Sequence, residues 1–229
     1  MLNLRLKIFI YMLITGLFGL LALPVSADDA AEAQDHVRRA RAVLRNFDRD
    51  PEMSWFRDHI GEAKAVMIIP TYVKAGFIFG GGGGKGVLLA QNGKGKWVGP
   101  VFYNVASASV GLQAGIEAAE LVLLVMTQKG LDALMGTKAQ LGADASVAAG
   151  PVGAGVQAAT ADVLTYARAK GAFLGLSLVG SIIMPNDSYD NAYYGQTVAP
   201  ADVLVRQSVS NNKASALIRE VGAAAHTKR

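Results

Sequence analysis

The sequence predicts a single α+β domain: a strongly curved, mainly antiparallel sheet or barrel of Gly/Ala-rich strands, flanked by N-terminal and C-terminal helices. Three observations lead to this prediction. Residues 28–50 carry an apolar stripe at helical spacing, and residues 202–209 and 214–221 also read as helical. Between them, from Lys64 to Ile183, runs of β-branched and aromatic residues alternate with turn signals. Many of these predicted strands carry small side chains, which allow backbones to approach closely.

The first 27 residues are predicted to be a signal peptide and not part of the fold. Arg5 and Lys7 form a basic n-region, residues 8–23 form an apolar core, and the small residues of 24–27 mark a cleavage site before Asp28. The alternative is an uncleaved anchor, although sixteen apolar residues fall short of a comfortable membrane span. The remaining 202 of the 229 residues are enough for one domain with a real core.

Composition favours an exported protein in the periplasm. Removing the leader leaves 20 basic against 18 acidic residues, so the net charge falls from +4 to +2. This small excess argues only weakly for a polyanionic partner such as nucleic acid. The chain has no cysteine, so it forms no disulfide, offers no thiol chemistry and carries no cysteine-linked lipid.

Residues 28–51 are predicted to form an N-terminal amphipathic helix ahead of the main domain at 52–229. Pro51 ends the helix. Its narrow, alanine-rich apolar stripe has spacings of three and four residues and consists of Val37, Ala40, Leu44 and Phe47.

Arginines surround this stripe, and they allow two interpretations. A basic amphipathic helix can lie on an anionic membrane surface. The alternative, which we favour because the stripe is narrow, is a helix that docks on the domain and leaves its arginines in water. The arginines are Arg38, Arg39, Arg41, Arg45 and Arg49.

The middle of the chain contains most of the expected strands. The segment 65–69 is predicted to be a buried strand that ends at Pro70, and Asn92–Gly93 is a turn signal typical of β-hairpins. Further strands are expected around Phe77 and Phe79, at 87–90, at 96–98 after the turn, and at 143–159.

Three predictions concern the second half of the chain. Thr127 is expected to cap a short helix that carries Leu131, Leu134 and Met135. Residues 162–183 are predicted to hold two strands that turn at Lys170–Gly171. The segment 187–191, made of Asp, Ser, Tyr and Asn, is predicted to be a turn and not a calcium loop.

An unbroken run of five glycines, Gly80–Gly84, lies between apolar segments and has Lys74 on one side and Lys85 on the other. Five glycines in a row cost conformational entropy and therefore need a reason. Together with Gly86 the run matches a G-x-G-x-x-G pattern (Gly81, Gly83, Gly86), but a strand and not a helix is expected after it, so no nucleotide site is predicted. We expect a sheet element that needs bare backbone for close packing. The alternative is that Lys74 or Lys85 contacts a lipid phosphate.

No pattern in the sequence points to catalysis or to a cofactor. The only histidines are His36, His59 and His226, and none has metal-ligand spacing to a second histidine. No serine has a recognisable base near it in sequence. We therefore expect a non-enzymatic protein.

Several motifs, taken in order, resemble one known family. They are 73–77, 81–87, Trp97 with Pro100, 111–115, 144–151, 166–183 and 193–195. The chain resembles the SYLF-domain family, a lipid-binding module of endocytic actin-patch proteins that also occurs alone in exported bacterial proteins. The resemblance covers about residues 52–206. It implies binding of phosphoinositides and other acidic phospholipids, an actin-binding activity in the fungal branch, and an amphipathic helix placed before the domain and used on membranes.

Together these observations predict a periplasmic protein that binds acidic phospholipid, with phosphoinositide-like headgroups, at a membrane surface. Phe47 would enter the interface together with Leu44. The predicted headgroup contacts are Arg38, Arg41 and Arg45 on the helix, with Lys74, Lys85 and Lys170 near the glycine run.

Two alternatives from other functional classes stay open. The first is a structural or scaffolding module that binds a periplasmic protein partner through small-residue surfaces or sheet edges. The second is a carrier that encloses an apolar ligand, which would require a cavity. Neither nucleic acid nor nucleotide is expected as a partner.

Overall fold

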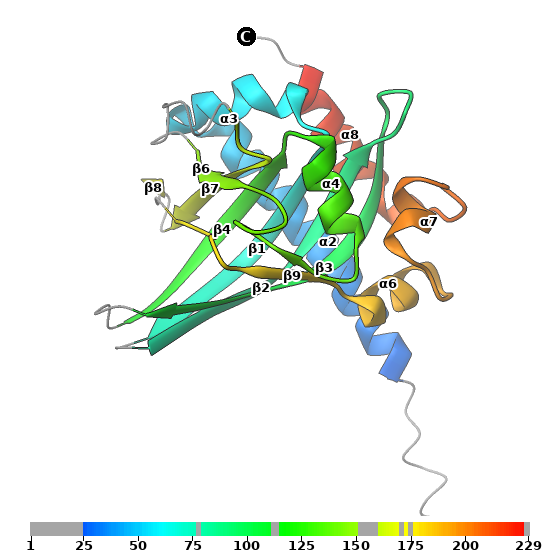
Figure 1. The fold of residues 1–229 in the computed structure, drawn as a ribbon. Coiled ribbons are helices and arrows are strands. Elements are labelled where there is room, and N and C mark those ends of the chain that lie inside the picture. Colours follow the sequence, from blue (N-terminus) through cyan, green and yellow to red (C-terminus); the bar gives the residue numbers. More distant parts are fainter. Residues whose placement is uncertain are drawn as a thin grey trace, which may run out of the picture.

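One curved sheet organises the fold, and helices lie against both of its faces (Figure 1). The computed structural model describes residues 25–76, 79–110, 115–150, 160–169, 172–173 and 176–226. The strand order is β5-β9-β3-β2-β1-β4-β7-β6, and β8 pairs with β7. The strands are β1 (Ala65–Gly76), β2 (Phe79–Gln91), β3 (Trp97–Val110), β4 (Gly115–Val125), β5 (Ala139–Gln140), β6 (Val147–Ala149), β7 (Val163–Ala169), β8 (Ala172–Phe173) and β9 (Ile182–Pro185).

Helices precede, interrupt and follow the strands. They are α2 (Val25–Arg49), α3 (Ser54–His59), α4 (Gln128–Met135), α6 (Asp187–Tyr194), α7 (Pro200–Leu204) and α8 (Ser215–His226), with short 3₁₀ turns at Pro51–Met53, Ile60–Glu62 and Asn212–Ala214. Of the described strand pairs, β6 with β7 is parallel and the others are antiparallel. The predicted class, an α+β domain with a strongly curved, mainly antiparallel sheet and terminal helices, is confirmed.

Each long strand contributes alternate residues to two separate cores. On one face, called here the outer face, Val66 and Ile68 of β1 pack in a cluster with α2, α3 and α8. On the other, the inner face, Met67 and Ile69 pack in a second cluster with α4 and α7. A strand buried on both faces reads as a continuous apolar run, which is why 65–69 was recognisable in the sequence.

The N-terminal helix is docked on the outer face. All four residues of its predicted stripe (Val37, Ala40, Leu44 and Phe47) are buried in the outer cluster. This confirms the docked interpretation of the helix. The described part of α2 begins at Val25, three residues before the predicted cleavage point, whereas the rest of the predicted signal peptide lies outside the described residues. No helix in the described part of the chain is long and apolar enough to cross a membrane.

The glycine run is the first half of one long strand, β2. The predicted strand at 87–90 is its second half. The predicted end of the preceding strand at Pro70 is wrong, because β1 continues to Gly76 through a register shift between Ile68 and Thr71. A bulge is a place where a sheet tolerates proline, since the ladder hydrogen bond is already interrupted there.

Close packing explains why glycines are needed on the inner face of β2. A Cβ on Gly82 would lie 2.5 Å from the hydroxyl oxygen of Tyr72, and one on Gly84 would lie 2.6 Å from the carbonyl oxygen of Thr71. A Cβ on Gly86 would lie 2.9 Å from Cγ1 of Ile69. The interpretation of the run as a sheet element that needs bare backbone is confirmed.

Of the predictions made from local sequence signals, the helix cap and the hairpin turn are confirmed and one turn is wrong. The side chain of Thr127 accepts a hydrogen bond from the Gly130 amide and caps α4, as predicted. The hairpin at Asn92–Gly93 is also confirmed, with β3 returning from Trp97. The predicted turn at 187–191 is wrong: it is helix α6, capped by Asn186, whose side chain accepts from the Tyr189 amide. Turn and cap chemistry use the same residue types, and the sequence alone did not separate them.

The remaining predictions are confirmed only in part. The helix predicted at 202–209 is shorter and ends at Leu204. Of the strand region predicted at 143–159, β6 is described, and residues 151–159 lie outside the described part. Strands β7 and β8 flank the predicted turn at Lys170–Gly171, which also lies outside it.

Candidate functional site

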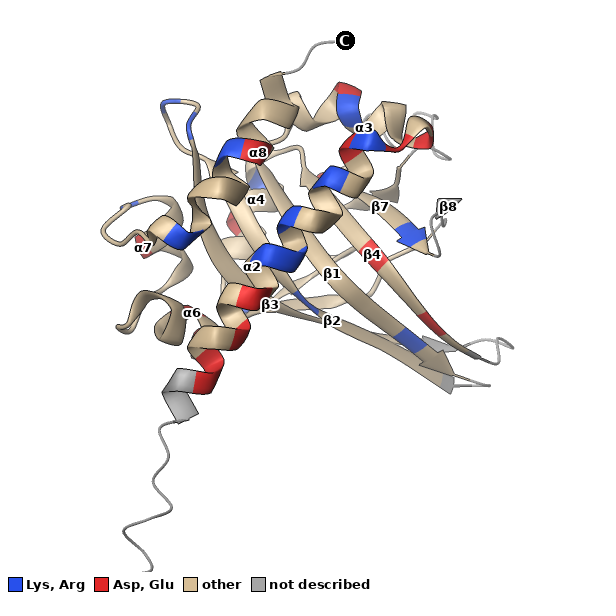
Figure 2. Cartoon of the chain, turned by 180° about the vertical axis from the view of Figure 1, so that it is seen from behind, with Lys and Arg blue, Asp and Glu red and all other residues tan. Residues whose placement is uncertain are grey.

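The solvent-exposed side of α2 carries a ridge of four arginines, Arg38, Arg39, Arg41 and Arg45. Figure 2 shows the basic residues along this helix. Arg38 and Arg39 share one acid, with N–O distances to the Asp35 carboxylate of 2.8 and 2.6 Å. The two arginine side chains are 68% and 65% exposed. Burial alone would raise the pKa of Asp35, but the neighbouring Arg39 and Arg38 lower it overall. One carboxylate neutralises one of the two cations, so this part of the helix keeps a net positive charge.

The other two predicted arginines connect α2 to α8. Arg41 and Arg45 both reach the Glu220 carboxylate, at 2.7 and 2.5 Å. Burial would raise the pKa of Glu220, but the hydrogen bonds from the two arginines lower it. Here too one acid is shared by two cations, although these arginines also hold two helices together. Their predicted role at headgroups therefore competes with a structural role.

Phe47 lies where it cannot meet a membrane while α2 is docked. Its ring is buried in the outer cluster and packs edge-to-face on Phe56, with 5.8 Å between the centroids. Leu44 is buried in the same cluster. In this arrangement the sheet covers the apolar stripe, so neither side chain is available to a bilayer while α2 is docked, and their entry into a membrane stays a prediction.

Lys85 belongs to a small polar cluster under α2 and α6. Its Nζ donates to the hydroxyl of Tyr189 at 2.6 Å and lies 3.9 Å from the Glu32 carboxylate. The Tyr189 hydroxyl in turn donates to Glu32. Nε2 of His36 donates to the Lys85 carbonyl at 2.7 Å, and burial lowers the pKa of this histidine. Lys85 is 44% exposed but already has an anionic neighbour.

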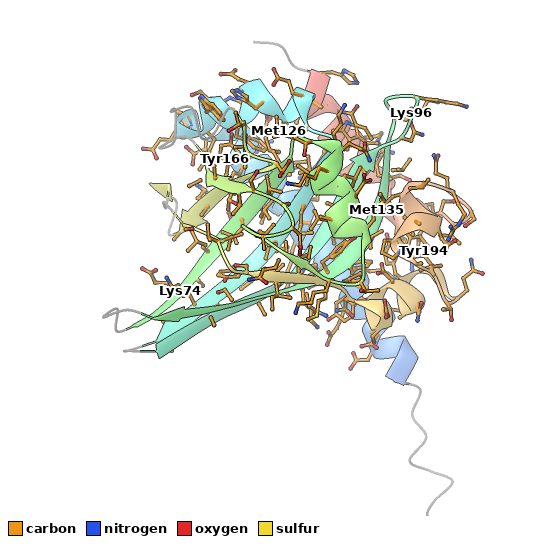
Figure 3. All side chains as sticks on the ribbon, in the orientation of Figure 1. Lys74, Lys96, Met126, Met135, Tyr166 and Tyr194 are labelled. Carbon is orange, nitrogen blue, oxygen red and sulfur yellow. The ribbon has the colours of Figure 1, made fainter. Side chains whose placement is uncertain are left out.

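The other two predicted lysines do not join this cluster. In the strand register Lys74 lies opposite Gly82 of β2 and opposite Glu117 of β4. It is two residues after Tyr72, so both side chains are on the inner face of β1. Lys85 lies on the outer face, so the sheet separates the two side chains. Figure 3 shows Lys74 near the far end of the strands. Lys170 lies outside the described residues.

Two buried aspartates form contacts that the sequence did not reveal. Asp190 accepts a hydrogen bond from the Phe102 amide at 3.0 Å, and burial raises its pKa to about 8. Asp162 accepts from the hydroxyl of Thr127 and from the amide and hydroxyl of Ser146. Burial would raise the pKa of Asp162, but these hydrogen bonds lower it to about 2. Each of these two carboxylates connects segments that are far apart in the sequence, so no local sequence pattern predicts the contact.

Within the described part of the chain these acids do not form a metal centre, and the cleft described beside α4 is small. No group of three or more His, Cys, Asp or Glu within the described ranges is arranged to hold a metal ion. A cleft of about 190 Å³ lies between α4, α7 and the β2–β3 turn, lined by side chains that include Gln91, Gln128 and Leu204. It is smaller than the roughly 300–1,000 Å³ of typical small-molecule sites, and its partly amide lining does not support an apolar-ligand carrier.

A comparison with protein families matches this chain to one of them. The family model Ysc84, described as "Las17-binding protein actin regulator", matches residues 106–224. This match includes the last five residues of β3, all of β4 and the later elements up to residue 224 of α8.

Curated relatives are similar over most of this chain. The human SH3 domain-containing YSC84-like protein 1 is 29% identical over 192 residues, which is 79% of this chain and 55% of the relative. LAS seventeen-binding protein 3 of Saccharomyces cerevisiae is 35% identical over 156 residues, or 64% and 34% of the two chains. Protein YSC84 of the same yeast is 30% identical over 186 residues, or 75% and 39%. The chain thus spans about half the length, or less, of the curated relatives it matches.

Proposed function

Because the chain belongs to the Ysc84 family of SYLF-domain proteins, we propose that it is a non-enzymatic module that binds acidic phospholipid at a membrane surface. The predicted signal peptide would bring it to the periplasm. The observation that carries the proposal is the arginine ridge of α2, in which Asp35 and Glu220 are each shared by two arginines.

The ridge favours an electrostatic contact over insertion of the helix. The apolar stripe of α2 is buried in the domain, so the helix offers a bilayer only its charged side. Near-surface cations contribute about 1 kcal/mol each on an anionic membrane, and salt screens this attraction. Arg38 and Arg39 are the most available cations of the ridge, because they are well exposed and their shared partner neutralises only one of them.

Vesicle flotation with paired variants tests the proposal. Replacing Arg38 and Arg39 by glutamine removes two exposed charges, which should weaken binding to anionic vesicles by about 2 kcal/mol, or roughly thirtyfold, at low salt. The matched control replaces Arg206 and Lys94 by glutamine. It also removes two exposed charges, but these lie away from α2. Lys94 is in the β2–β3 turn, and Arg206 follows α7 and pairs with Asp202 of that helix. Equal weakening by both pairs of substitutions would reduce the effect to net charge and refute a site on α2.

A protein partner is the second candidate, favoured by what the relatives are called. LAS seventeen-binding protein 3 is named for binding another protein, and the family model carries a similar description. This chain would then serve as a scaffolding module in the periplasm. Native mass spectrometry of protein purified from its own cell envelope separates the candidates: co-purifying phospholipid supports the first, and a bound protein without lipid supports the second.

Export itself can be tested at the N-terminus. Cleavage before Asp28 would leave a mature chain without the first three residues of α2. Intact-mass measurement of the periplasmic fraction should find this mature form. A full-length protein in the cytoplasmic fraction would contradict the proposed location.

A further inference from the structure

The helices cover only part of the outer face of the sheet. Two contacts mark the edge of α2 that faces the strand ends: His36 donates to the Lys85 carbonyl on β2, and Asn46 donates to the Glu120 carboxylate on β4 at 3.2 Å. Past this line β3, β2, β1 and β4 continue, and no helix of the described chain lies over them (Figure 2). This end of the outer face is a surface and not a core.

The strand register identifies the side chains of this uncovered surface. Two rows run across the four strands, and all eight positions are uncharged and aliphatic or glycine. We call these eight residues the bare patch. In strand order β3, β2, β1, β4, the first row is Ala106, Gly83, Val73 and Ala118, and the second is Ala108, Gly81, Ala75 and Ile116.

At this end of the four strands the apolar residues lie on the exposed outer face and polar residues lie on the inner face, which is the reverse of the usual arrangement. The alanines, Val73 and Ile116 of the bare patch are all exposed. The inner face of the same four strands instead carries Tyr72, Lys74, Ser107 and Glu117, and the hydroxyls of Tyr72 and Ser107 share a hydrogen bond of 2.6 Å. An antiparallel sheet with one face in water normally puts its polar residues there. The bare patch therefore has the composition of a surface that something covers.

The two large side chains of the bare patch stand out among the described residues. Ile116 is 80% exposed and Val73 is 40% exposed. They lie on adjacent strands, one row apart, because Ala75 pairs with Ile116 and Val73 pairs with Ala118. Among the other exposed large hydrophobic residues of the described chain, Val179 and Val205 lie in turns outside these four strands. Met184 lies on the neighbouring strand β9, opposite Asn104 of β3.

Size argues against a second copy of the chain as the cover. Strands lie about 4.8 Å apart and same-face residues about 6.8 Å apart, so the bare patch covers roughly 250 Å². Stable protein interfaces bury about 800 Å² per partner. The patch alone is too small for such an interface.

Charge and position favour a bilayer. The bare patch lies on the same side of the molecule as the arginine ridge of α2 (Figure 2). An apolar surface beside a cationic one is what binds the interface of an anionic membrane. Resting on the proposed lipid-binding function, we propose that the bare patch enters this interface while the arginines contact the headgroups. Penetration is shallow, because open strand edges carry backbone groups that hydrocarbon cannot satisfy.

Site-specific fluorescence tests the insertion directly. The chain contains no cysteine, so Ile116→Cys and Val179→Cys each introduce a unique labelling site for an environment-sensitive nitrobenzoxadiazole dye. Val179 is the matched control, since it is 63% exposed but lies in a turn outside the ribbon. With vesicles of phosphatidylcholine and phosphatidylglycerol, the dye at 116 should shift to the blue and brighten severalfold. The dye at 179 should not change.

The outcomes distinguish this inference from the function on which it rests. If the labelled proteins float with anionic vesicles and the dye at 116 does not respond, the inference is overturned and lipid binding stands. If neither protein floats, the proposed function itself fails, and the inference with it.

A substitution gives a second readout that does not need a dye. Ile116→Asp should weaken vesicle binding about tenfold, whereas Val179→Asp should leave it unchanged. Circular dichroism and thermal unfolding of both variants check that the fold is intact. Equal binding by the two folded variants would contradict insertion of the bare patch.

Discussion

Gly84 and Thr71 lie so close across the β1–β2 pair that a Cβ on Gly84 would sit 2.6 Å from the Thr71 carbonyl oxygen. The contact is with backbone, which cannot rotate away as a side chain could. Of the five-glycine run, Gly82 and Gly84 are thus required by the backbone at the β1 bulge and by the large residue Tyr72 beside it. The run that first suggests a nucleotide site instead lets β2 pack closely against β1 at one end of the sheet.

Gly84→Ala should therefore destabilise the protein. We expect a loss of about 1–3 kcal/mol in the free energy of unfolding, as for other overpacked sites, even though alanine restricts the unfolded chain more than glycine does. Urea unfolding followed by circular dichroism measures the change. The control is Gly93→Ala, where an added Cβ would meet nothing within 4 Å. Equal stability of the two variants would contradict the packing explanation.

Glu220→Gln should loosen the contact between α2 and α8. The acid accepts from Arg41 and Arg45, so its loss leaves two arginines side by side without a shared anion. The pKa of Glu220 is lowered in the fold, so its stabilising contribution is present above the unfolded pKa and is lost as pH falls through the folded value. Unfolding free energies should differ between wild type and variant at pH 7 and converge in acid. A constant difference down to pH 2 would argue against the ion pairs.

Asp190→Asn should change how the free energy of unfolding depends on pH between about 4 and 8. Burial raises the pKa of Asp190 to about 8. The folded state then holds a proton that the unfolded state releases, so stability falls as pH rises from about 4 to about 8. Asparagine keeps an oxygen for the Phe102 amide but carries no charge. The variant should be more stable than wild type at pH 8, by an amount on the order of 1–3 kcal/mol.

Urea titrations at pH 5 and pH 8 measure this difference. Wild type should lose stability between the two values, and Asp190→Asn should lose less. The opposite order would mean that the carboxyl is ionised and satisfied in the fold.

Glu32→Gln should strengthen binding to anionic vesicles. It removes the anion beside Lys85 and leaves a 44% exposed cation whose described neighbours are the hydroxyl and the ring of Tyr189. One net charge near an anionic surface corresponds to about 1 kcal/mol, or roughly fivefold in affinity. The control is Asp132→Asn on α4, which removes one negative charge from the inner side of the sheet. No gain for Glu32→Gln over Asp132→Asn would rule out Lys85 as a lipid contact.

Sequence reasoning succeeded where the signal was local. The Thr127 cap and the Asn92–Gly93 turn need only neighbouring residues, and both were predicted. The stripe of α2 was predicted as well, because helical periodicity shows which side chains share a face. Periodicity does not show what covers that face, and so a membrane and the domain's own sheet remained alternatives until the fold was known.

Features that depend on distant partners escaped prediction. Pro70 reads as a strand end, but β2 and β4 on either side accommodate it in a bulge. Glu220 meets Arg41 across 179 residues of chain, and Asp190 meets Phe102 across 88. The bare patch likewise appears only after strand register places Val73 beside Ala118 and Ala75 beside Ile116. Its residues come from four strands, and no single segment carries the pattern.

The salt dependence of vesicle flotation tests the central claim most directly. Wild-type protein would be mixed with neutral phosphatidylcholine vesicles and with vesicles that also contain phosphatidylglycerol, at about 50 and 500 mM salt. Electrostatic binding through the α2 ridge predicts flotation with anionic vesicles at low salt, marked loss at high salt and little flotation with neutral vesicles. Equal flotation with both lipids, or none with either, would contradict it.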